Sequence, residues 1–461
     1  MSPDTVLTRW RLRWRSPASW TALLPLPGAD EDPVRVRLKA LDPAFIAALS
    51  RVDGVHFFRL VVVPPVVSAG QGVRLLLNVV HDGMPAQHLS ALCEAIGPLL
   101  LEAMAEAKVP GGLAGLPEYL HRHRVKENTF FIGAVGKTVP EIRREQELRE
   151  RLEELVDRQD VTGEAARFAT IEARRQALRA ELALRFPGPH GRSGDPMAAV
   201  GRGLDLLLTF LFFPIIGVLG RDLAETVNRT QGRVRRALAW ILCGVWWVYG
   251  ALFTGLAMAL VRVLEWIEPD VEAPLPDEEQ LAQLENAEDR IPRNELTVWF
   301  PVRNTWIGRR LLAVILFGSE RGVRHFWTQG RLAGAENIHY ARLLQVDKGR
   351  HLIFMSDYEG AFDRYIDHFV GVGGHSRAVV PISSRLEGCP KTRWLYLQED
   401  PPRFRRRWRN LIRLHQLKAI VWYSAYPFLS ANEILANARL WDGLWAERLD
   451  EEDARAWARL L

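Results

Sequence analysis

Two copies of a His-x-x-Arg pattern lie 283 residues apart in this chain of 461 residues. His56 and Arg59 belong to the stretch VHFFR, and His339 and Arg342 belong to the stretch IHYAR; an apolar run follows each. Such a pair forms one site only if both side chains reach the same ligand. Side chains alternate across a strand, so positions i and i+3 face opposite ways. The spacing therefore predicts that neither pair converges on one ligand.

Each arginine of the pattern would need a counter-charge if it is buried. Asp357 and Glu359 on the next predicted strand are available to Arg342, and Asp82 is available to Arg59. The favoured interpretation of the pattern is a structural histidine and a structural ion pair. The alternative, that Arg342 and Asp357 bind a cofactor, stays open.

The second half of the chain carries two histidines that the first half lacks. His368 and His375 have no counterpart in the first copy, which makes them candidates for an unequal task such as binding a metal or a haem. The alternative is that they are surface or packing residues. The candidate cofactor-binding set is therefore His368, His375, Arg342 and Asp357, with no catalytic residue and no metal site assigned.

Several classes of chemistry have no support in this sequence. The phosphate-binding, dinucleotide-binding, zincin and hydrolase-elbow motifs are all missing. The three cysteines show no C-x-x-C spacing, so a zinc site and a disulfide framework are not expected, and the thiols are those of a reduced, cytosol-facing protein. The 60 basic residues are interleaved with 55 acidic ones. The dense basic run at 405–410 is typical of a solvated helix face, so nucleic-acid binding is not expected.

The chain repeats itself in three places, in the same order. The last pair of segments also aligns two helix-capping boxes, Thr138 with Glu141 and Ser430 with Glu433. One match could be chance, but three in order indicate an internal repeat. The matching segments are 55–63 with 338–346, 74–83 with 351–360, and 125–142 with 417–434.

Each copy of the repeat predicts the order βαββαβ. Two such ferredoxin-like units commonly pack sheet to sheet, so the expected fold is α+β, an α+β barrel that hides both sheet faces. In the first copy we expect strands over 34–40, 55–63, 73–80 and 129–136 and helices over 42–52 and 85–107. In the second we expect strands over 296–302, 338–346, 351–358 and 419–427 and helices over 309–326 and 362–370.

An apolar hairpin separates the two copies. The segment 203–220 has one charge and the segment 237–261 has none, with Trp240 and Trp266 flanking the latter. About 20 apolar residues cross a bilayer, so a membrane hairpin is expected and the lipid bilayer is the expected partner. A buried helical hairpin is the alternative. No signal peptide is expected, and we place the large domains in the cytoplasm, although the five arginines of the connecting loop over 221–236 argue for the opposite sidedness.

These features divide the chain into five regions. The hairpin and the two linking regions lie between the repeats, and 138–202 predicts long charged helices. The expected regions are the first repeat over 1–137, a charged helical segment over 138–202, the hairpin over 203–264, an acidic linker over 265–294 and the second repeat over 295–461.

Three phrases of the sequence carry a resemblance: IHYARLLQVDKGRHLIFMSDYEGAFDRYIDHF, KAIVWYSAYPFLSANEI and HRVKENTFFIGAVGKTVPEIRREQELRE. They resemble an uncharacterised bacterial family of tandem ferredoxin-like proteins, which is loosely similar to the dye-decolourising peroxidases. The resemblance implies the α+β-barrel fold and a haem in the second half. The peroxidase pattern G-x-x-D-G is missing, since the nearest stretch here is DYEG at 357–360.

Two functions therefore remain open. The first is a membrane-associated protein with a ligand-binding or scaffold role, and protein partners unknown. The alternative is a haem-dependent, peroxidase-like oxidoreductase on the same fold. The missing catalytic motifs favour the first function. The extra histidines, His368 and His375, leave the second function open.

Overall fold

The fold is described from a computed structural model of the whole chain. The structure describes residues 17–66, 72–83, 85–188, 233–269, 273–286, 288, 292–325, 327, 330, 332, 335, 337–370, 380–389, 391 and 401–461.

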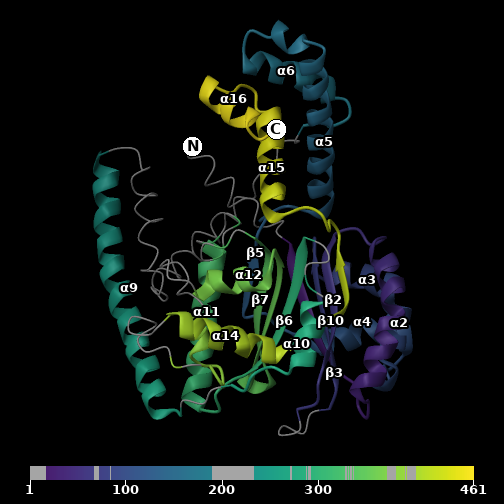
Figure 1. Cartoon of the computed structure of the whole chain (residues 1–461), viewed down its shortest axis with the longest axis vertical. Coiled ribbons are helices and arrows are strands. Elements are labelled where there is room, and N and C mark those ends of the chain that lie inside the picture. The colour runs from purple at the N-terminus through teal and green to yellow at the C-terminus, as the bar shows by residue number, and fades with distance from the viewer. Residues whose placement is uncertain are drawn as a thin grey trace.

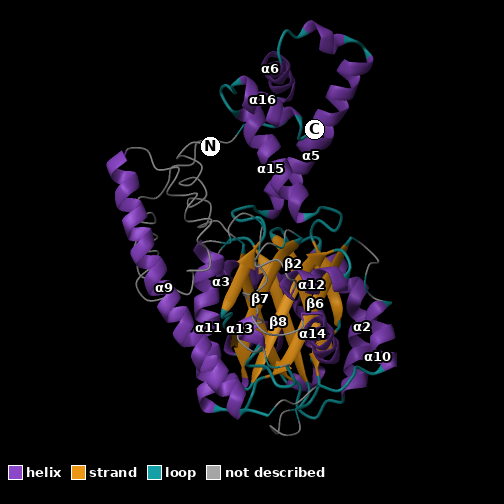
Figure 2. Cartoon of the chain, turned by 60° about the vertical axis from the view of Figure 1, so that its left-hand side comes forward, coloured by secondary structure: helices purple, strands orange, loops and turns teal. Residues whose placement is uncertain are grey.

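Two antiparallel sheets of five strands each pack face to face, so the expected α+β class is confirmed (Figure 2). The first sheet has the order β10-β2-β3-β1-β4 and the second has the order β5-β7-β8-β6-β9. The strands of the first sheet are β1 (Ala18–Pro25), β2 (Val55–Val63), β3 (Arg74–His81), β4 (Arg124–Val125) and β10 (Ala419–Ser424). Those of the second are β5 (Thr129–Ile132), β6 (Arg293–Pro301), β7 (Ile338–Val346), β8 (His351–Glu359) and β9 (Gln416–Leu417).

The last strand of each half is divided between the two sheets. In the first half β4 pairs with β1, and the chain then crosses so that β5 pairs with β7 of the other sheet. In the second half β9 pairs with β6, and β10 then pairs with β2. Each half therefore completes the other half's sheet, which covers one edge of each and joins the repeats into one unit.

Helices cover the outer face of each sheet (Figure 1). The first sheet is covered by α2, α3 and α4, and the second by α11, α12, α13 and α14. Their bounds are α2 (Glu31–Leu49), α3 (Pro85–Ala103), α4 (Gly112–Arg122), α11 (Trp306–His325), α12 (Phe362–Val370), α13 (Val380–Ser383) and α14 (Pro401–His415). The acidic linker carries α10 (Glu278–Glu285).

The expected strand over 34–40 is wrong, because these residues begin α2. Val34 and Leu38 are both buried, one helical turn apart, while Val36 between them is exposed. Helix and strand periods both fit VRVRLKA, and burial selects the helix. The first strand is instead β1, whose Trp20, Ala22 and Leu24 are buried.

Four helices form a stalk that projects from one end of the sheets (Figures 1 and 2). They are α5 (Val139–Val161), α6 (Ile171–Leu182), α15 (Ala431–Trp445) and α16 (Glu451–Ala458), and they share an apolar core of their own. The equivalent helices α5 and α15 both begin with the expected capping box, at Thr138 and Ser430. The charged helices expected after residue 138 are thus confirmed.

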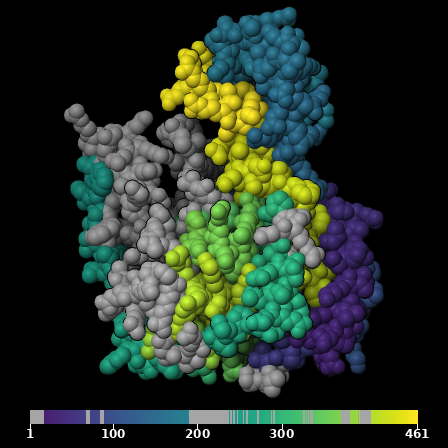
Figure 3. Space-filling view, viewed as in Figure 1, coloured from purple at the N-terminus to yellow at the C-terminus, as the bar shows by residue number. Residues whose placement is uncertain are grey.

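Helix α9 (Arg233–Ile267) runs along one side of the molecule (Figures 1 and 3). Its C-terminal part packs on α11 through Val261, Leu264 and Leu311. The other arm of the expected hairpin, 203–220, lies outside the described residues. Among the helices that the structure describes, none is long and apolar enough to cross a membrane.

Candidate functional site

A β-bulge lies at each histidine of the repeated pattern. The strand register shifts at His56 in β2 and at His339 in β7. A bulge adds a residue and breaks the alternation of side chains. The rings of His56 and Phe57 both contact Tyr340 and Tyr426 between the sheets. The expectation that the strand period separates histidine from arginine is therefore wrong, since both lie in the layer between the sheets.

Asp357 on β8 neutralises both equivalent arginines. Its Oδ2 lies 3.0 Å from Nη2 of Arg342, and its Oδ1 pairs with Arg59 of the other sheet. Arg342 also donates to Asn78 across the sheets. All these groups are buried, and burial lowers the pKa of Arg342 to about 10, although Asp357 opposes that change. The cluster joins the two sheets, with each oxygen of Asp357 occupied by an arginine.

Two equivalent His–carboxylate pairs lie where the stalk meets the sheets. His56 Nε2 lies 2.8 Å from Asp82, and His339 Nε2 lies 2.7 Å from Glu359. Asp82 also accepts from the backbone N–H of Val139 (2.9 Å), the first residue of α5. Glu359 accepts in the same way from Ala431 (2.5 Å), the first residue of α15. The repeat therefore uses its histidines to orient the carboxylates that anchor the two stalk helices.

Arg293 adds a positive charge beside one of these pairs. It is 2% exposed, donates to Ser424 (2.7 Å) and lies over the Tyr426 ring at 4.9 Å. Burial and this neighbouring arginine lower the pKa of His339 to about 4, so His339 is neutral at pH 7. Arg293, His339, Ser424 and Tyr426 therefore contact one another in the buried layer, which is typical of a structural network.

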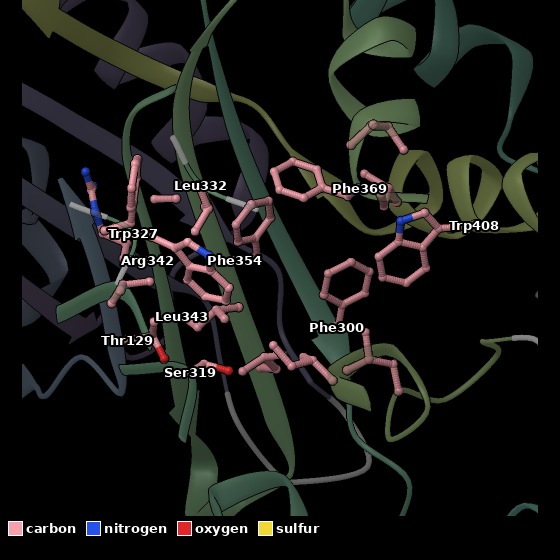
Figure 4. Close-up of a pocket in the computed structure, with 18 residues that line it drawn as sticks. Thr129, Phe300, Ser319, Trp327, Leu332, Arg342, Leu343, Phe354, Phe369 and Trp408 are labelled. Carbon is pink, nitrogen blue, oxygen red and sulfur yellow. The ribbon is translucent and has the colours of Figure 1, made fainter. Parts of the chain in front are cut away.

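A cavity lies on the other face of the second sheet, beneath its helices (Figure 4). The centre of a water-sized sphere can occupy about 90 Å³ of it, and the empty space is about 860 Å³ when the solvent at its open mouth is counted. Six of its eighteen lining residues are aromatic. The lining residues are Thr129, Phe131, Phe300, Ser319, Val323, Trp327, Leu332, Ala341, Arg342, Leu343, Leu352, Phe354, Ile366, Phe369, Ile382, Leu386, Trp408 and Ile412.

The few polar groups of the cavity wall are already bonded to the protein. The hydroxyl of Thr129 donates to the carbonyl of Leu316 (3.0 Å), and that of Ser319 donates to the carbonyl of Ile315 (3.0 Å). The guanidinium of Arg342 is engaged between the sheets, as described above. The wall thus offers an apolar, aromatic surface, which is the kind of lining that small-molecule sites have.

One aligned position of the repeat carries a smaller residue at the cavity than in the core behind the first sheet. Ala341 of β7 aligns with Phe58 of β2. Phe58 is fully buried, and its ring stacks against Phe45 of α2 at 6.2 Å. Ala341 has no ring at the equivalent position and lines the cavity instead. The cavity in the second half therefore lies where the second copy has an alanine and the first copy has a phenylalanine.

The four sequence candidates are not brought together. Arg342 and Asp357 form an ion pair, His368 is exposed on α12 with its ring 6.5 Å from that of Phe369, and His375 lies outside the described residues. The cavity lining includes no histidine, cysteine, methionine or tyrosine that could bind a haem iron. The lining of this cavity therefore does not fit a haem. Nor do the described residues contain a cluster of three or more His, Cys, Asp or Glu suited to a metal ion.

The cavity residues were missed because no motif marks them. Ala341, Leu343, Leu352 and Phe354 alternate with residues that face the other sheet, as ordinary strand residues do. The available signal was the inequality of the copies, alanine against phenylalanine at one aligned position.

The chain was compared with known proteins. No family model, curated protein or solved structure matches it. The kinship with the dye-decolourising peroxidase group therefore stays a prediction.

Proposed function

We propose that this chain is a binding protein for an apolar small molecule, held between the second sheet and helices α11, α12, α13 and α14. The observation that carries the proposal is the aromatic cavity around Ala341, where the other copy of the repeat is filled by Phe58. A packed protein interior contains few voids larger than a water molecule. A side chain that fills the space in one copy and a smaller one that leaves it open in the other indicate a specialised site.

The wall chemistry defines the class of ligand. Its hydroxyls already bond to backbone carbonyls, so a ligand gains affinity mainly from buried apolar area, about 25 cal/mol per Å². Rings such as Phe354 and Trp408 favour stacked or edge-on contacts with flat, unsaturated skeletons. The proposed ligand is therefore neutral, unsaturated or aromatic, and poor in hydrogen-bonding groups.

All-trans-retinol is a suitable probe, because it is neutral, flat and fluorescent. We expect the purified full-length chain to bind one retinol saturably. Ala341→Phe places the ring of the first copy in the cavity and should weaken binding at least tenfold. Ala173→Phe, the same change at an exposed position of α6, is the matched control. Equal affinity of the chain and Ala341→Phe would remove the basis of this proposal.

The haem-dependent alternative has no supporting contact among the described residues, since the cavity wall supplies no axial ligand. Its test is the absorption spectrum of the chain titrated with haemin. An intense Soret band at one haem per chain, lost in His375→Ala or His368→Ala, would favour it over the binding protein.

We also propose that the chain associates with a membrane, with its large domains on the cytoplasmic side. The apolar residues of α9 support the association, and the three cysteines without C-x-x-C spacing support the side. Fractionation of cells that express the chain tests the association, and protease treatment of intact and of broken cells tests the side. Full recovery with the soluble proteins would contradict the association.

A further inference from the structure

Exposed large apolar side chains concentrate on two neighbouring helices. Among the described residues, 22 such side chains are exposed, and 15 of them belong to α9 or α11. Scattered apolar residues are normal on a surface, but a gathering of this kind marks an interaction site. On α9 they are Trp240, Ile241, Val245, Val248, Tyr249, Leu252, Leu256, Leu260, Val263, Trp266 and Ile267; on α11 they are Trp306, Ile307, Val314 and Phe317.

The exposed residues of α9 follow one face of the helix. Steps of three or four residues separate Ile241, Val245, Val248, Leu252 and Leu256, which is the helical repeat. Leu252 is 69% exposed and Leu256 is 72% exposed. No charged residue occurs from 237 to 261. A face of this length without a charged residue is unusual for a helix that meets water.

Tryptophans and arginines mark the ends and the neighbourhood of this face. Trp240 near the start of α9 is 48% exposed, and Trp266 near its end is 81% exposed. On α11, Arg310 lies 5.9 Å over the ring of Trp306, and Arg321 lies 4.7 Å over the ring of Phe317. Amphipathic tryptophans and long basic side chains are the residues that lie at the level of lipid headgroups.

We infer that the exposed face of α9, together with the apolar residues of α11, docks on an anionic lipid bilayer. The helices lie along the membrane surface, with their apolar side chains in the boundary between headgroups and acyl chains. Arginines beside the apolar residues complement the negative headgroups. A second copy of the chain is the other candidate, but tryptophans near both ends of the face and arginines beside it are typical of a lipid surface.

This surface is the part of the molecule that would bind the membrane in the association proposed above. It is independent of the cavity, since none of its fifteen residues lines that space. Retinol binding and membrane docking can therefore fail separately.

Flotation of the full-length chain with vesicles tests the inference. The vesicles contain phosphatidylcholine alone or a 70:30 mixture of phosphatidylcholine and phosphatidylglycerol. We expect the chain to float with the mixed vesicles. Leu252→Glu/Leu256→Glu should reduce binding at least tenfold, because two charges would enter the apolar layer. Val161→Glu/Leu184→Glu, at positions 87% and 98% exposed on the stalk, is the matched control and should float as the unchanged chain does.

The arginines provide a second readout. Each basic residue near a charged surface contributes about fivefold to binding, so Arg310→Gln/Arg321→Gln should bind mixed vesicles about 25-fold more weakly. The same variant should bind pure phosphatidylcholine vesicles unchanged.

Two results would overturn the inference. One is that Leu252→Glu/Leu256→Glu floats as well as the unchanged chain. The other is a vesicle-free dimer that this variant abolishes while neither protein floats, which would assign the face to a second copy. Unchanged retinol binding by the variant shows that it is folded and keeps the two proposals distinguishable.

Discussion

The helix-facing sides of the two sheets have the same origin and different packing. Behind the first sheet, Phe58 and its neighbours form a continuous core with α2 and α3. Behind the second sheet, the aligned Ala341 lines a cavity under α11, α12, α13 and α14. The first face maintains the fold, and the second offers space for a ligand. In a protein built from a repeat, the positions where the copies differ are therefore the informative ones.

The layer between the sheets shows the same inequality in its charges. Both copies supply an arginine, Arg59 and Arg342, but the carboxylate comes from the second copy alone, because Val80 of the first copy aligns with Asp357. Here the difference serves stability, since one acid between two arginines links the sheets.

Removal of that acid should have the largest effect on stability. Asp357→Asn leaves two buried arginines without their shared partner, so we expect a loss of about 5 kcal/mol, at the upper end for a broken buried ion pair. Urea unfolding of the full chain measures the change. Asp363→Asn, at an exposed position of α12, is the control and should cost about 1 kcal/mol or less. Equal effects of the two changes would contradict the assigned role of Asp357.

Exchange of the aligned residues Phe58 and Ala341 should have the next largest effect on stability. Phe58→Ala opens a cavity in a packed core and should cost about 3–4 kcal/mol. Ala341→Phe fills existing space, and its stability should stay within about 1 kcal/mol of that of the unchanged chain. Thermal unfolding of both variants would compare them. A large loss in Ala341→Phe would mean that the second half has no room for the ring.

Acid should weaken the joint between stalk and sheets through His339. The folded state holds the pKa of His339 at about 4, below its ordinary value near 6.5, so this stability is lost as the pH falls from about 6.5 through 4. The expected loss is about 3 kcal/mol at most. His339→Gln should flatten this part of a stability-against-pH curve. His88, whose pKa burial also lowers to about 4, should retain its own part of the slope.

An effect of similar size and opposite pH dependence concerns another unequal pair, in the stalk. Glu145 of α5 aligns with the uncharged Asn437 of α15. Burial raises the pKa of Glu145 to about 7 against the opposing effect of Lys137, so its folded state binds a proton more tightly. Stability should fall by at most about 3 kcal/mol as the pH rises from 4.5 through 7. Glu145→Gln should remove that decline; an unchanged curve would refute the assignment.

Much of the fold could be predicted because the repeat shows which segments are equivalent. The strands at 338–346 and 351–359, the capping boxes and the charged helices all follow from local patterns. The exchange of β5 and β10 could not be predicted, because strand partners are chosen by tertiary packing. The segment 34–40 was assigned wrongly because its alternation also fits a helix with Val34 and Leu38 inward.

The site was harder to predict from sequence. A bulge at His56 or His339 leaves no mark in the sequence, yet it reverses which side the histidine faces. The candidates His368 and His375 were chosen because they are absent from the first copy. That principle was sound for Ala341, where the difference is a loss of volume and carries no reactive group.

Photoaffinity labelling tests the central claim most directly. The full chain would be labelled with a diazirine-bearing retinol analogue at one equivalent, and the modified residues would be mapped by mass spectrometry. We predict labels on cavity residues such as Phe354, Phe369 and Trp408, and we predict that Ala341→Phe loses these labels. Labels confined to α9, or labels on the cavity that persist in Ala341→Phe, would contradict it.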